Sequence, residues 1–327
     1  MTIKEIAAIA GVSPAAISRF LNGGSLSEKK REAIRAAIEQ TGYTPEPAAQ
    51  TLRTKTTDLV GLIVPKLDSE SVSRLTAGAE RVLAAEGYLS LIAVFRNDPE
   101  KERTFLSLLQ KRQVAGAILM ATEADARLEA VIRDLTVPVV VTGQSLPHTP
   151  CVCHDDFGAA QELTRLVLAR GRRRPVYLGV TERDAAVGVA RKQGVLAALR
   201  EAGLEDALPA EICSFDIEGG RRGMQALLAR EPRLDAVICA TDRIAFGAME
   251  VLKQAGRRIP QDVSVTGMGD SWASRHVQPN LTTAHFYYKT CGETAARMLV
   301  ELMRSKDVNS PAQQTRLSYE ICVRDSV

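Results

Sequence analysis

Between residues 58 and 269 the sequence alternates short runs rich in β-branched residues with amphipathic stretches of helical periodicity. Strands separated by helices of roughly 10–15 residues indicate βαβ crossovers, and therefore parallel sheets. The alternation occurs in two successive series, so the sequence predicts two doubly wound α/β lobes. The predicted strands are 59–65, 89–95, 115–121, 137–143, 174–180, 210–215, 234–240 and 263–269. The predicted helices are 71–88, 100–113, 126–135, 159–171, 189–203, 220–230 and 243–256.

Two facing lobes of this kind predict a ligand site between them. In a doubly wound fold the ligand binds beyond the carboxyl ends of the strands. The tail returns from Leu281 with apolar character and ends in an amphipathic helix, 292–305, which we expect to cross back to the first lobe. The first lobe therefore combines about residues 58–158 with 288–320, and the second spans about residues 159–287.

Residues 2–23 read TIKEIAAIAGVSPAAISRFLNG and predict a helix-turn-helix. Gly11 takes a left-handed backbone without steric cost and ends the first helix. Ser13 is a good N-cap for the second helix, and Pro14 sits in its first turn, where a missing N–H does no harm. The apolar face residues are Ile3, Ile6, Ala7, Ala10, Val12, Ile17 and Leu21. The outward positions of the second helix are Pro14, Ala15, Ala16, Ser18, Arg19 and Asn22. Such a pair either enters a DNA major groove or serves only as a packing hairpin.

A third helix is predicted over residues 27–41, and Gly42 ends it. Two prolines follow, and the apolar stretch after them is long enough only for one short helix, which is unstable alone in water. Residues 45–57 are therefore predicted to form a hinge that is helical only when a partner or DNA holds it. Residues 1–57 together form the predicted DNA-binding domain.

The net charge of +3 is concentrated in residues 1–57, which hold eight Lys or Arg against five Asp or Glu and leave 34 of each for the rest. A basic surplus beside a helix-turn-helix is the electrostatic footprint of a DNA reader. Three charges are a small number, so chance is the alternative explanation.

Composition argues against several other classes of protein. No apolar run approaches the roughly 20 residues of a membrane span. The amphipathic start, with Lys4 and Glu5, is unlike a secretory signal, so we expect a cytoplasmic protein. The six cysteines are predicted to be reduced, and the Cys151-x-Cys153 spacing is too tight for a usual zinc pair. Dispersed histidines and the absence of GxGxxG argue against a catalytic triad, a metal centre or a nucleotide cofactor.

A helix-turn-helix, a hinge and two α/β lobes in this order resemble the LacI (lactose repressor) family of bacterial transcription regulators. The segments that carry the resemblance are TIKEIAAIAGVSPAAISRFLNG, GYTPEPAAQTLR, DDFGA at 155–159, ATDRIAFGAMEVL at 240–252 and IPQDVSVTG at 259–267. The resemblance covers the full chain. It implies lobes of periplasmic-binding-protein type, a homodimer or tetramer, a pseudo-palindromic operator DNA, and a small effector, usually a sugar or nucleobase.

Within that family, VPKLDSES and CHDDFGA look most like trehalose repressors. This finer resemblance implies trehalose or trehalose phosphate as the first effector to consider, with sucrose-like sugars next. It also implies that Lys66 faces a sugar phosphate.

The resemblance assigns DNA contacts by position. Pro14 and Ala15 match base-reading places, Arg19 matches a DNA-contacting cation, and Leu52 matches a leucine that wedges into the minor groove. Pro14 and Ala15 depart from the pattern because neither side chain can hydrogen-bond a base edge, so discrimination there must be apolar. The predicted DNA-binding residues are Thr2, Ser13, Pro14, Ala15, Ser18, Arg19, Asn22, Ala49 and Leu52.

Lys66 lies at the carboxyl edge of the first predicted strand and faces the cleft. Asp68, Ser69 and Ser71 follow it. They either cap the next helix or contact the effector, and helix-start N–H groups suit a phosphate or hydroxyl. Arg191 opens a helix of the second lobe and matches a family arginine that binds the effector.

Three further effector contacts are predicted, each with an alternative. Phe95 ends the second strand and either stacks on a sugar ring or packs in the lobe. Asp242 either caps a helix or binds a hydroxyl. Trp272, the single tryptophan, forms either a cleft wall or core. The sequence departs from the family at Gly269, where many members hold a sugar hydroxyl with an aspartate, because here the acid is Asp270.

Two functions remain open from the sequence. The first is a ligand-responsive transcription repressor, in which the effector either releases DNA or tightens binding to it. The second is a sugar-binding protein of periplasmic type, which has the same two lobes. The DNA-reading segment favours the first.

Overall fold

The computed structural model describes residues 1–21, 24–43, 57–111, 114–204, 208–305 and 311–327. The chain divides into two compact units, Met1–Thr57 and Asp58–Val327. Apart from Thr57, the predicted hinge lies outside the described residues. The six cysteines are free thiols. None of the helices in the described ranges has the length and apolar character needed to cross a membrane.

Three helices form the first unit: α1 (Ile3–Ile9), α2 (Pro14–Leu21) and α3 (Glu28–Thr41). A capping box starts α1, because the Glu5 N–H donates to Thr2 Oγ1 at 3.3 Å while the Thr2 N–H donates to Glu5 Oε2 at 2.7 Å. Gly11 has a φ of +63° in the turn after α1, and Gly42 has a φ of +62° where α3 ends. The sequence thus places both helix ends at glycines that accept a left-handed backbone.

The core of this unit is small and apolar. The side chains of Ile6, Ile17 and Ile34, one from each helix, are fully buried. Ala16 is also buried, with 6% of its surface exposed, so the prediction that it faces outward was wrong. It lies one position before Ile17 on α2, and the buried stripe of that helix is wide enough to include both.

The first lobe of the second unit contains a six-stranded parallel sheet in the order β11-β5-β4-β3-β1-β2. Its strands are β1 (Leu59–Val64), β2 (Leu89–Val94), β3 (Gly116–Met120), β4 (Val139–Thr142), β5 (Cys151–His154) and β11 (Gln314–Leu317). Its helices are α5 (Glu70–Ala85), α6 (Pro99–Lys111), α7 (Ala126–Arg133) and α12 (Tyr288–Arg304).

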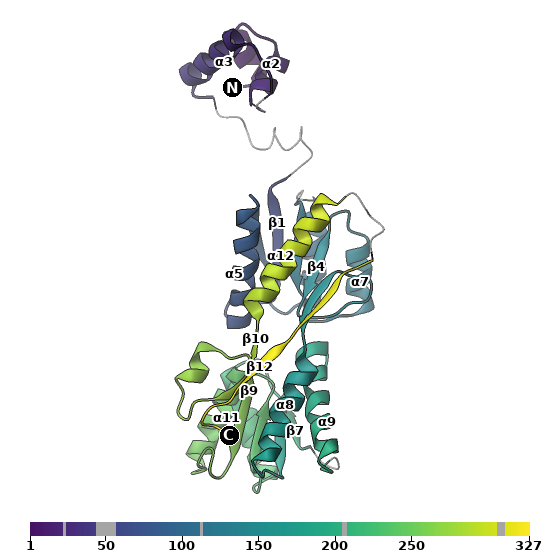
Figure 1. Ribbon diagram of the computed structural model, residues 1–327, viewed down its shortest axis with the longest axis vertical. Coiled ribbons are helices and arrows are strands. Elements are labelled where there is room, and N and C mark those ends of the chain that lie inside the picture. Colours follow the sequence, from purple (N-terminus) through teal and green to yellow (C-terminus); the bar gives the residue numbers. More distant parts are fainter. Residues whose placement is uncertain (22–23, 44–56, 112–113, 205–207, 306–310) are drawn as a thin grey trace. The chain divides into compact units, whose positions relative to one another are not determined.

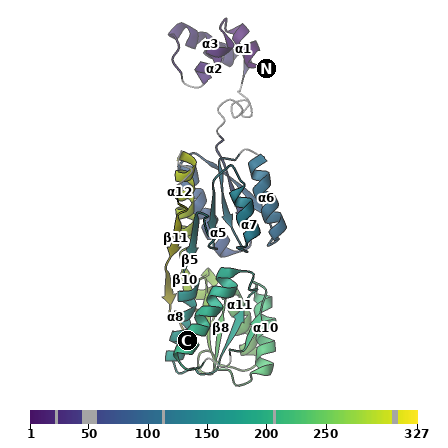
Figure 2. The same ribbon diagram turned by 90° about the vertical axis from the view of Figure 1, so that its right-hand side faces the viewer.

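Successive side chains of β1 enter different layers of the core, as the pleat of a strand requires. Val60 and Leu62 pack in the cluster formed with α5 and α12. Ile63 packs in the cluster formed with α6 and α7. Helices therefore cover both faces of the sheet, which explains the nearly continuous apolar sequence of its central strands (Figure 2).

The tail returns to the first lobe, where α12 crosses α5 at close range (Figure 1). An added Cβ at Gly78 of α5 would lie 2.1 Å from the Lys289 carbonyl oxygen, and one at Gly292 of α12 would lie 2.0 Å from the Leu75 carbonyl oxygen. Glycine on both helices therefore permits the backbone contact that docks the tail.

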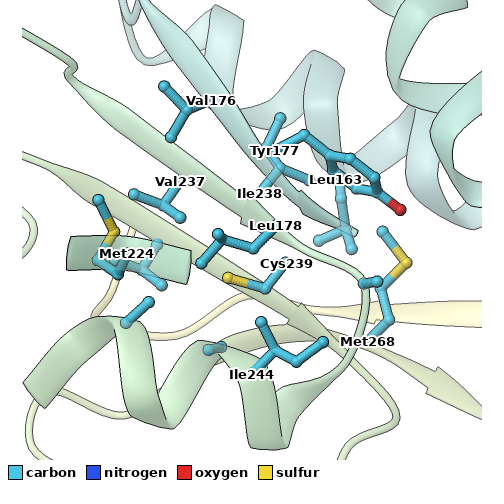
Figure 3. Packing of buried hydrophobic residues seen from close by; sticks show 14 of the residues in the cluster. Leu163, Val176, Tyr177, Leu178, Met224, Val237, Ile238, Cys239, Ile244 and Met268 are labelled. Atoms are coloured by element: carbon cyan, nitrogen blue, oxygen red, sulfur yellow. The ribbon is translucent and has the colours of Figure 1, made fainter. Parts of the chain in front are cut away.

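The second lobe contains a sheet in the order β12-β10-β9-β8-β6-β7, in which only β12 runs antiparallel to its neighbour. Its strands are β6 (Pro175–Gly179), β7 (Ala210–Ile212), β8 (Ala236–Cys239), β9 (Ser264–Met268), β10 (Thr282–Phe286) and β12 (Tyr319–Cys322). Its helices are α8 (Asp156–Ala169), α9 (Arg191–Glu201), α10 (Ile217–Arg230) and α11 (Asp242–Gln254), with a π-helix, η1 (Ala185–Ala190), and a 3-10 helix, η2 (Trp272–Arg275). Figure 3 shows part of its core, in which Ile238 lies beside Tyr177 and Leu163.

The chain passes between the lobes three times, each time through a single residue. Asp155 separates β5 from α8, Tyr287 separates β10 from α12, and Ser318 separates β11 from β12. The last crossing places residues 319–327 in the second lobe, whereas the sequence put 288–320 in the first and left the end unassigned. Strands β5, β11 and β12 were not predicted. Unlike β4 and β8, which have the same length, each contains a histidine or a charged residue and does not form a continuous run of apolar and β-branched residues.

Candidate functional site

The first unit exposes the beginning of α2. Pro14, Ala15 and Arg19 are exposed, as are Ser13 and Thr2, and Ser18 is half-buried. The Ala16 N–H donates to Ser13 Oγ at 3.3 Å, so Ser13 caps the helix. Small side chains at this helix start leave its backbone open to a groove or a phosphate. The other predicted DNA contacts, Asn22, Ala49 and Leu52, lie outside the described residues.

In the second unit, a cavity of about 430 Å³ lies between the two lobes. Its walls come from residues that follow the carboxyl ends of strands in both sheets, such as Lys66 after β1, Gln144 after β4 and Thr241 after β8. The parallel strands therefore bring the ends of many elements to one place. Of the predicted effector residues, the cavity is lined by Lys66, Ser71, Arg191 and Asp242.

Arg191 forms the floor of the cavity together with Asp156. The Arg191 Nε and Nη2 atoms each lie 2.7 Å from Asp156 Oδ1, and the two side chains are 5% and 7% exposed. The guanidinium also donates to the Ala240 carbonyl and lies 4.8 Å from the centre of the Phe286 ring. Asp156 was not predicted as a site residue, although it belongs to the quoted DDFGA segment.

Lys66 lies next to an aromatic ring, whereas Arg191 is paired with a carboxylate. Its ammonium lies 5.4 Å from the centre of the Phe215 ring, which belongs to the second lobe. Within the described structure it forms no ion pair. Burial lowers the pKa of Lys66, and the charge of Arg243 lowers it further, while Asp68 and Asp216 raise it. The cavity therefore holds one partly buried cation whose charge no carboxylate neutralises directly.

Asp242 is buried, and hydrogen bonds within the second lobe hold its carboxylate. It accepts from the Ser271 N–H at 2.7 Å, from Ser274 Oγ at 2.8 Å and from Thr283 Oγ1 at 2.5 Å. Burial raises the pKa of this carboxyl, and these hydrogen bonds lower it. Thr241, and not Asp242, is the N-cap of α11, because the Ile244 N–H donates to Thr241 Oγ1.

Asp270 does not replace the acid missing at Gly269. Its carboxylate is 1% exposed and lies 3.0 Å from Arg275 Nη2 and 3.0 Å from His285 Nδ1, with Arg324 as a third cationic partner. It does not line the cavity. Gly269 leaves only backbone at the place where the sequence comparison expected a hydroxyl-binding carboxylate.

Ser71 and Asp68 differ in their access to the cavity. Ser71 lines it, and its hydroxyl lies 2.9 Å from that of Ser69. Ser69 is the N-cap of α5 but makes no side-chain cap bond. The Asp68 side chain is 74% exposed and does not line the cavity, while the Asp68 carbonyl accepts from Arg243 Nη1 at 3.2 Å. Asp68 therefore contacts the opposite lobe and not the cavity.

Phe95 and Trp272 do not line the cavity. Phe95 is fully buried in the cluster formed with α6 and α7, so it packs in the lobe, which is the alternative given for it above. Trp272 is 68% exposed at the start of η2, outside both the cavity and the core. Its ring lies 5.9 Å from the His276 ring, and the side chain thus faces solvent.

Several cavity residues carry contacts between the lobes that the sequence did not indicate. Gln144 Nε2 donates to Asp184 Oδ1 at 2.7 Å, and Gln144 Oε1 accepts from the Ala186 N–H at 3.2 Å. Burial raises the pKa of Asp184, while its hydrogen bonds with the Val187 N–H and Gln144 lower it. These residues follow β4 and precede α9, so only the folded chain brings them together.

The rim of the cleft adds two more contacts between the lobes. Arg74 Nη1 donates to the Asp270 carbonyl oxygen at 3.1 Å. The Trp272 N–H lies 3.1 Å from both carboxylate oxygens of Glu70, which also pairs with Arg74. The lobes are thus in direct contact around the cavity.

Comparison with known proteins agrees with both units. Residues 2–46 match the family described as "Bacterial regulatory proteins, lacI family". Residues 57–318 match "Periplasmic binding proteins and sugar binding domain of LacI family". The two matches follow the division of the chain seen in the structure.

Individual relatives cover nearly the whole chain. It is 32% identical over 336 residues to the HTH-type transcriptional regulator CelR of Thermobifida fusca, covering 99% of this chain and 98% of that protein. It is 30% identical over 303 residues to the sucrose operon repressor of Staphylococcus xylosus, covering 92% and 93%. A solved transcriptional regulator CelR–cellobiose complex aligns over all of both chains with a TM-score of 0.77 at 28% identity.

These matches decide the fold and the family but not the trehalose-repressor subtype, since neither named relative is a trehalose repressor. A helix-turn-helix and two parallel-sheet lobes of periplasmic-binding-protein type occur here in the order that the matched families have. The chain belongs to the LacI family and is a sequence-specific DNA-binding transcription regulator, not an enzyme.

Proposed function

We propose that this regulator is a repressor whose effector is a disaccharide or its phosphate. Lys66 from the first lobe and Arg191 from the second line the same cavity, so one ligand touching both would hold the lobes together. Trehalose and trehalose phosphate are the first ligands to examine. Cellobiose and sucrose follow, because the names of relatives mention them.

The proposed mechanism links the cleft to DNA through the state of the lobes. A ligand shifts a conformational equilibrium only to the extent that it prefers one state. A sugar that binds both lobes prefers the closed cleft, and closure would move the first lobes of a dimer apart and weaken DNA binding. An effector that tightens DNA binding would have the opposite preference, and a titration of operator binding against sugar distinguishes the two.

The test of the effector uses Lys66→Ala and calorimetry with trehalose and trehalose 6-phosphate. Because Lys66 is a partly buried cation of the cavity without an ion pair among the described residues, the variant should lose about tenfold or more of its affinity for the phosphosugar and much less for the neutral sugar. Operator binding without ligand should stay near wild type. Equal losses for both sugars would show that Lys66 is not a phosphate contact.

We further propose that Arg19 and the exposed start of α2 contact operator DNA, with Leu52 as a minor-groove wedge. Arg19→Ala should weaken specific binding by about tenfold and reduce the salt dependence, because a lost cation releases fewer counterions. Arg35→Ala on α3 removes the same charge from another exposed position and should cost less. Salt-insensitive binding, or equal losses for the two variants, would contradict this assignment.

We propose a homodimer as the DNA-binding form, acting in the cytoplasm where operator DNA lies. Edge strand β2 exposes Leu89, Leu91 and Ile92 by 61%, 43% and 46%. An exposed apolar edge strand is a ready surface for a second chain. Sedimentation at micromolar concentration should therefore report two chains, and a monomer would contradict this proposal.

A further inference from the structure

One buried nitrogen on the floor of the cavity lacks a partner. His154 ends β5, lines the cavity and is 9% exposed. Its Nε2 atom makes no hydrogen bond within the described structure. Leaving a buried polar atom unmatched is costly, and native structures rarely do so without a functional reason.

Neighbouring rings fix the direction of the His154 side chain. Its ring lies 5.3 Å from that of Phe286 and 5.2 Å from that of Tyr288, the latter edge to face. Burial lowers the pKa of His154, while the charge of Asp156 raises it and that of Arg191 lowers it.

Both hydrogen-bonding roles are open to this nitrogen. A neutral imidazole donates through one ring nitrogen and accepts through the other. Burial lowers the pKa of His154 and so favours the neutral ring. A hydroxyl both donates and accepts, so it can partner Nε2 in either tautomer.

The rest of the floor also suits a neutral group. Among the described residues, the contacts of Arg191 with Asp156 are made to Oδ1. The charge of Arg191 is already balanced by that carboxylate. A phosphate dianion has only acceptor oxygens and would lie beside the negative charge of Asp156, whereas a hydroxyl can donate to it.

We propose that His154 Nε2 forms a hydrogen bond with a hydroxyl of the effector, and that the hydroxyl-bearing end of the ligand lies on the floor while any phosphate lies beside Lys66. This inference rests on the proposed function, because it concerns the orientation of the ligand in the same cavity. His154 becomes a specificity-determining residue: it favours a polyol over a ligand with an alkyl or anionic group at that end.

The experiment compares His154→Phe, which keeps a ring but removes its hydrogen-bonding nitrogens, with His154→Gln, which keeps a side chain that can both donate and accept. His276→Phe alters an exposed histidine outside the cavity and serves as the control. Calorimetry is carried out with trehalose, trehalose 6-phosphate, cellobiose and sucrose. Melting temperatures are measured without ligand, and operator binding is measured for each variant.

His154→Phe should weaken the sugars that bind the wild type by about tenfold or more, because the ligand hydroxyl is left buried without a partner. The loss should be equal for a neutral sugar and its phosphate, unlike the loss in Lys66→Ala. His154→Gln should lose less. The melting temperature of ligand-free His154→Phe should equal or exceed that of the wild type, since the unmatched nitrogen is gone.

Unchanged affinity in His154→Phe would overturn the inference and leave the proposed function standing. A loss restricted to the phosphosugar would also overturn it, because it would place the phosphate on the floor. A ligand-free melting temperature several degrees lower would make His154 a structural residue. If the wild type bound operator but none of these sugars, the proposed effector class would fall and the hydroxyl assignment with it.

Discussion

The cationic residues at the two ends of the cavity differ in whether a carboxylate pairs with them. On the floor, Arg191 and Asp156 lie 2.7 Å apart and are almost completely buried. At the other end, Lys66 lies over the Phe215 ring without an ion pair among the described residues. The floor is electrostatically satisfied before any ligand arrives, whereas the Lys66 end is not.

Because of this difference, we expect the floor pair to contribute mainly to the stability of the fold and Lys66 mainly to ligand recognition. A buried pair is expensive to break, because the remaining charge has lost both water and partner. An unpaired, partly buried cation contributes little to stability, but it gains a partner when an anion binds. We therefore expect substitutions on the floor to affect folding first and those at Lys66 to affect ligand choice first.

The largest effect should come from breaking the floor pair. Arg191→Met leaves Asp156 buried and unpaired, and should lower the free energy of unfolding by about 3–5 kcal/mol. The double variant Arg191→Met with Asp156→Leu should recover most of that loss while still failing to bind sugar. Urea denaturation of the three proteins measures both steps.

A matched control lies on the surface of the second lobe. Arg165 Nε lies 2.7 Å from Glu201 Oε2, and the two side chains are 53% and 48% exposed. Arg165→Met should cost far less stability than Arg191→Met, because exposed ion pairs are weak. If both arginine variants lost the same stability, burial of the floor pair would not be the reason for its strength.

A second buried carboxyl group, that of Glu102, can be compared with Asp156. Glu102 on α6 is 1% exposed, and its Oε1 atom has no hydrogen-bond partner within the described structure. Burial raises the pKa of Glu102 to about 8. Unlike Asp156, this carboxyl forms no ion pair with a cation of the described residues, although the charge of Arg103 lowers its pKa in part. It should therefore tolerate burial only while it is protonated.

The raised pKa gives Glu102 a defined pH dependence. Its contribution is complete below the ordinary carboxyl value of 4.5 and is lost as the pH rises through about 8. Glu102→Gln should match the wild type near pH 5 and exceed it by about 1–3 kcal/mol at pH 9. Denaturation curves at the two pH values provide the test. Parallel changes in both proteins would mean that Glu102 is ionised throughout.

The sequence located the lobes, the cleft and its two cationic ends because each follows from a local rule. Alternating strands and helices predicted the parallel sheets, and the carboxyl ends of strands predicted where Lys66 would lie. Arg191 was predicted to bind the effector from the resemblance to the LacI family, and it lines the cavity. The helix pair followed from spacing, Gly11 and the N-cap at Ser13.

The sequence was least informative for residues whose position along the chain was correct but whose side-chain direction could not be predicted. Phe95 lies at the correct end of β2 but faces the interior, since one residue reverses the direction of a side chain along a strand. Trp272 lies in a cleft-edge loop but faces solvent. His154 and Asp156 were not identified as cavity residues, because their surroundings come from Phe286, Tyr288 and Arg191, which are distant in the sequence.

The smallest effect is expected at Lys66 in the absence of ligand. Burial lowers the pKa of this ammonium, so the folded state disfavours its charge, while the Phe215 ring and nearby acids offset part of that cost. Lys66→Met should therefore change the free energy of unfolding at pH 7 by less than about 1 kcal/mol, with a gain as the expected sign. A lowered lysine pKa penalises folding below the folded-state value, and the penalty disappears as the pH rises towards the ordinary value of 10.5. Any gain of the variant should thus shrink between pH 7 and pH 10. A clear loss of stability at pH 7 would show that Lys66 is held by the fold, and the contrast with Arg191 would fail.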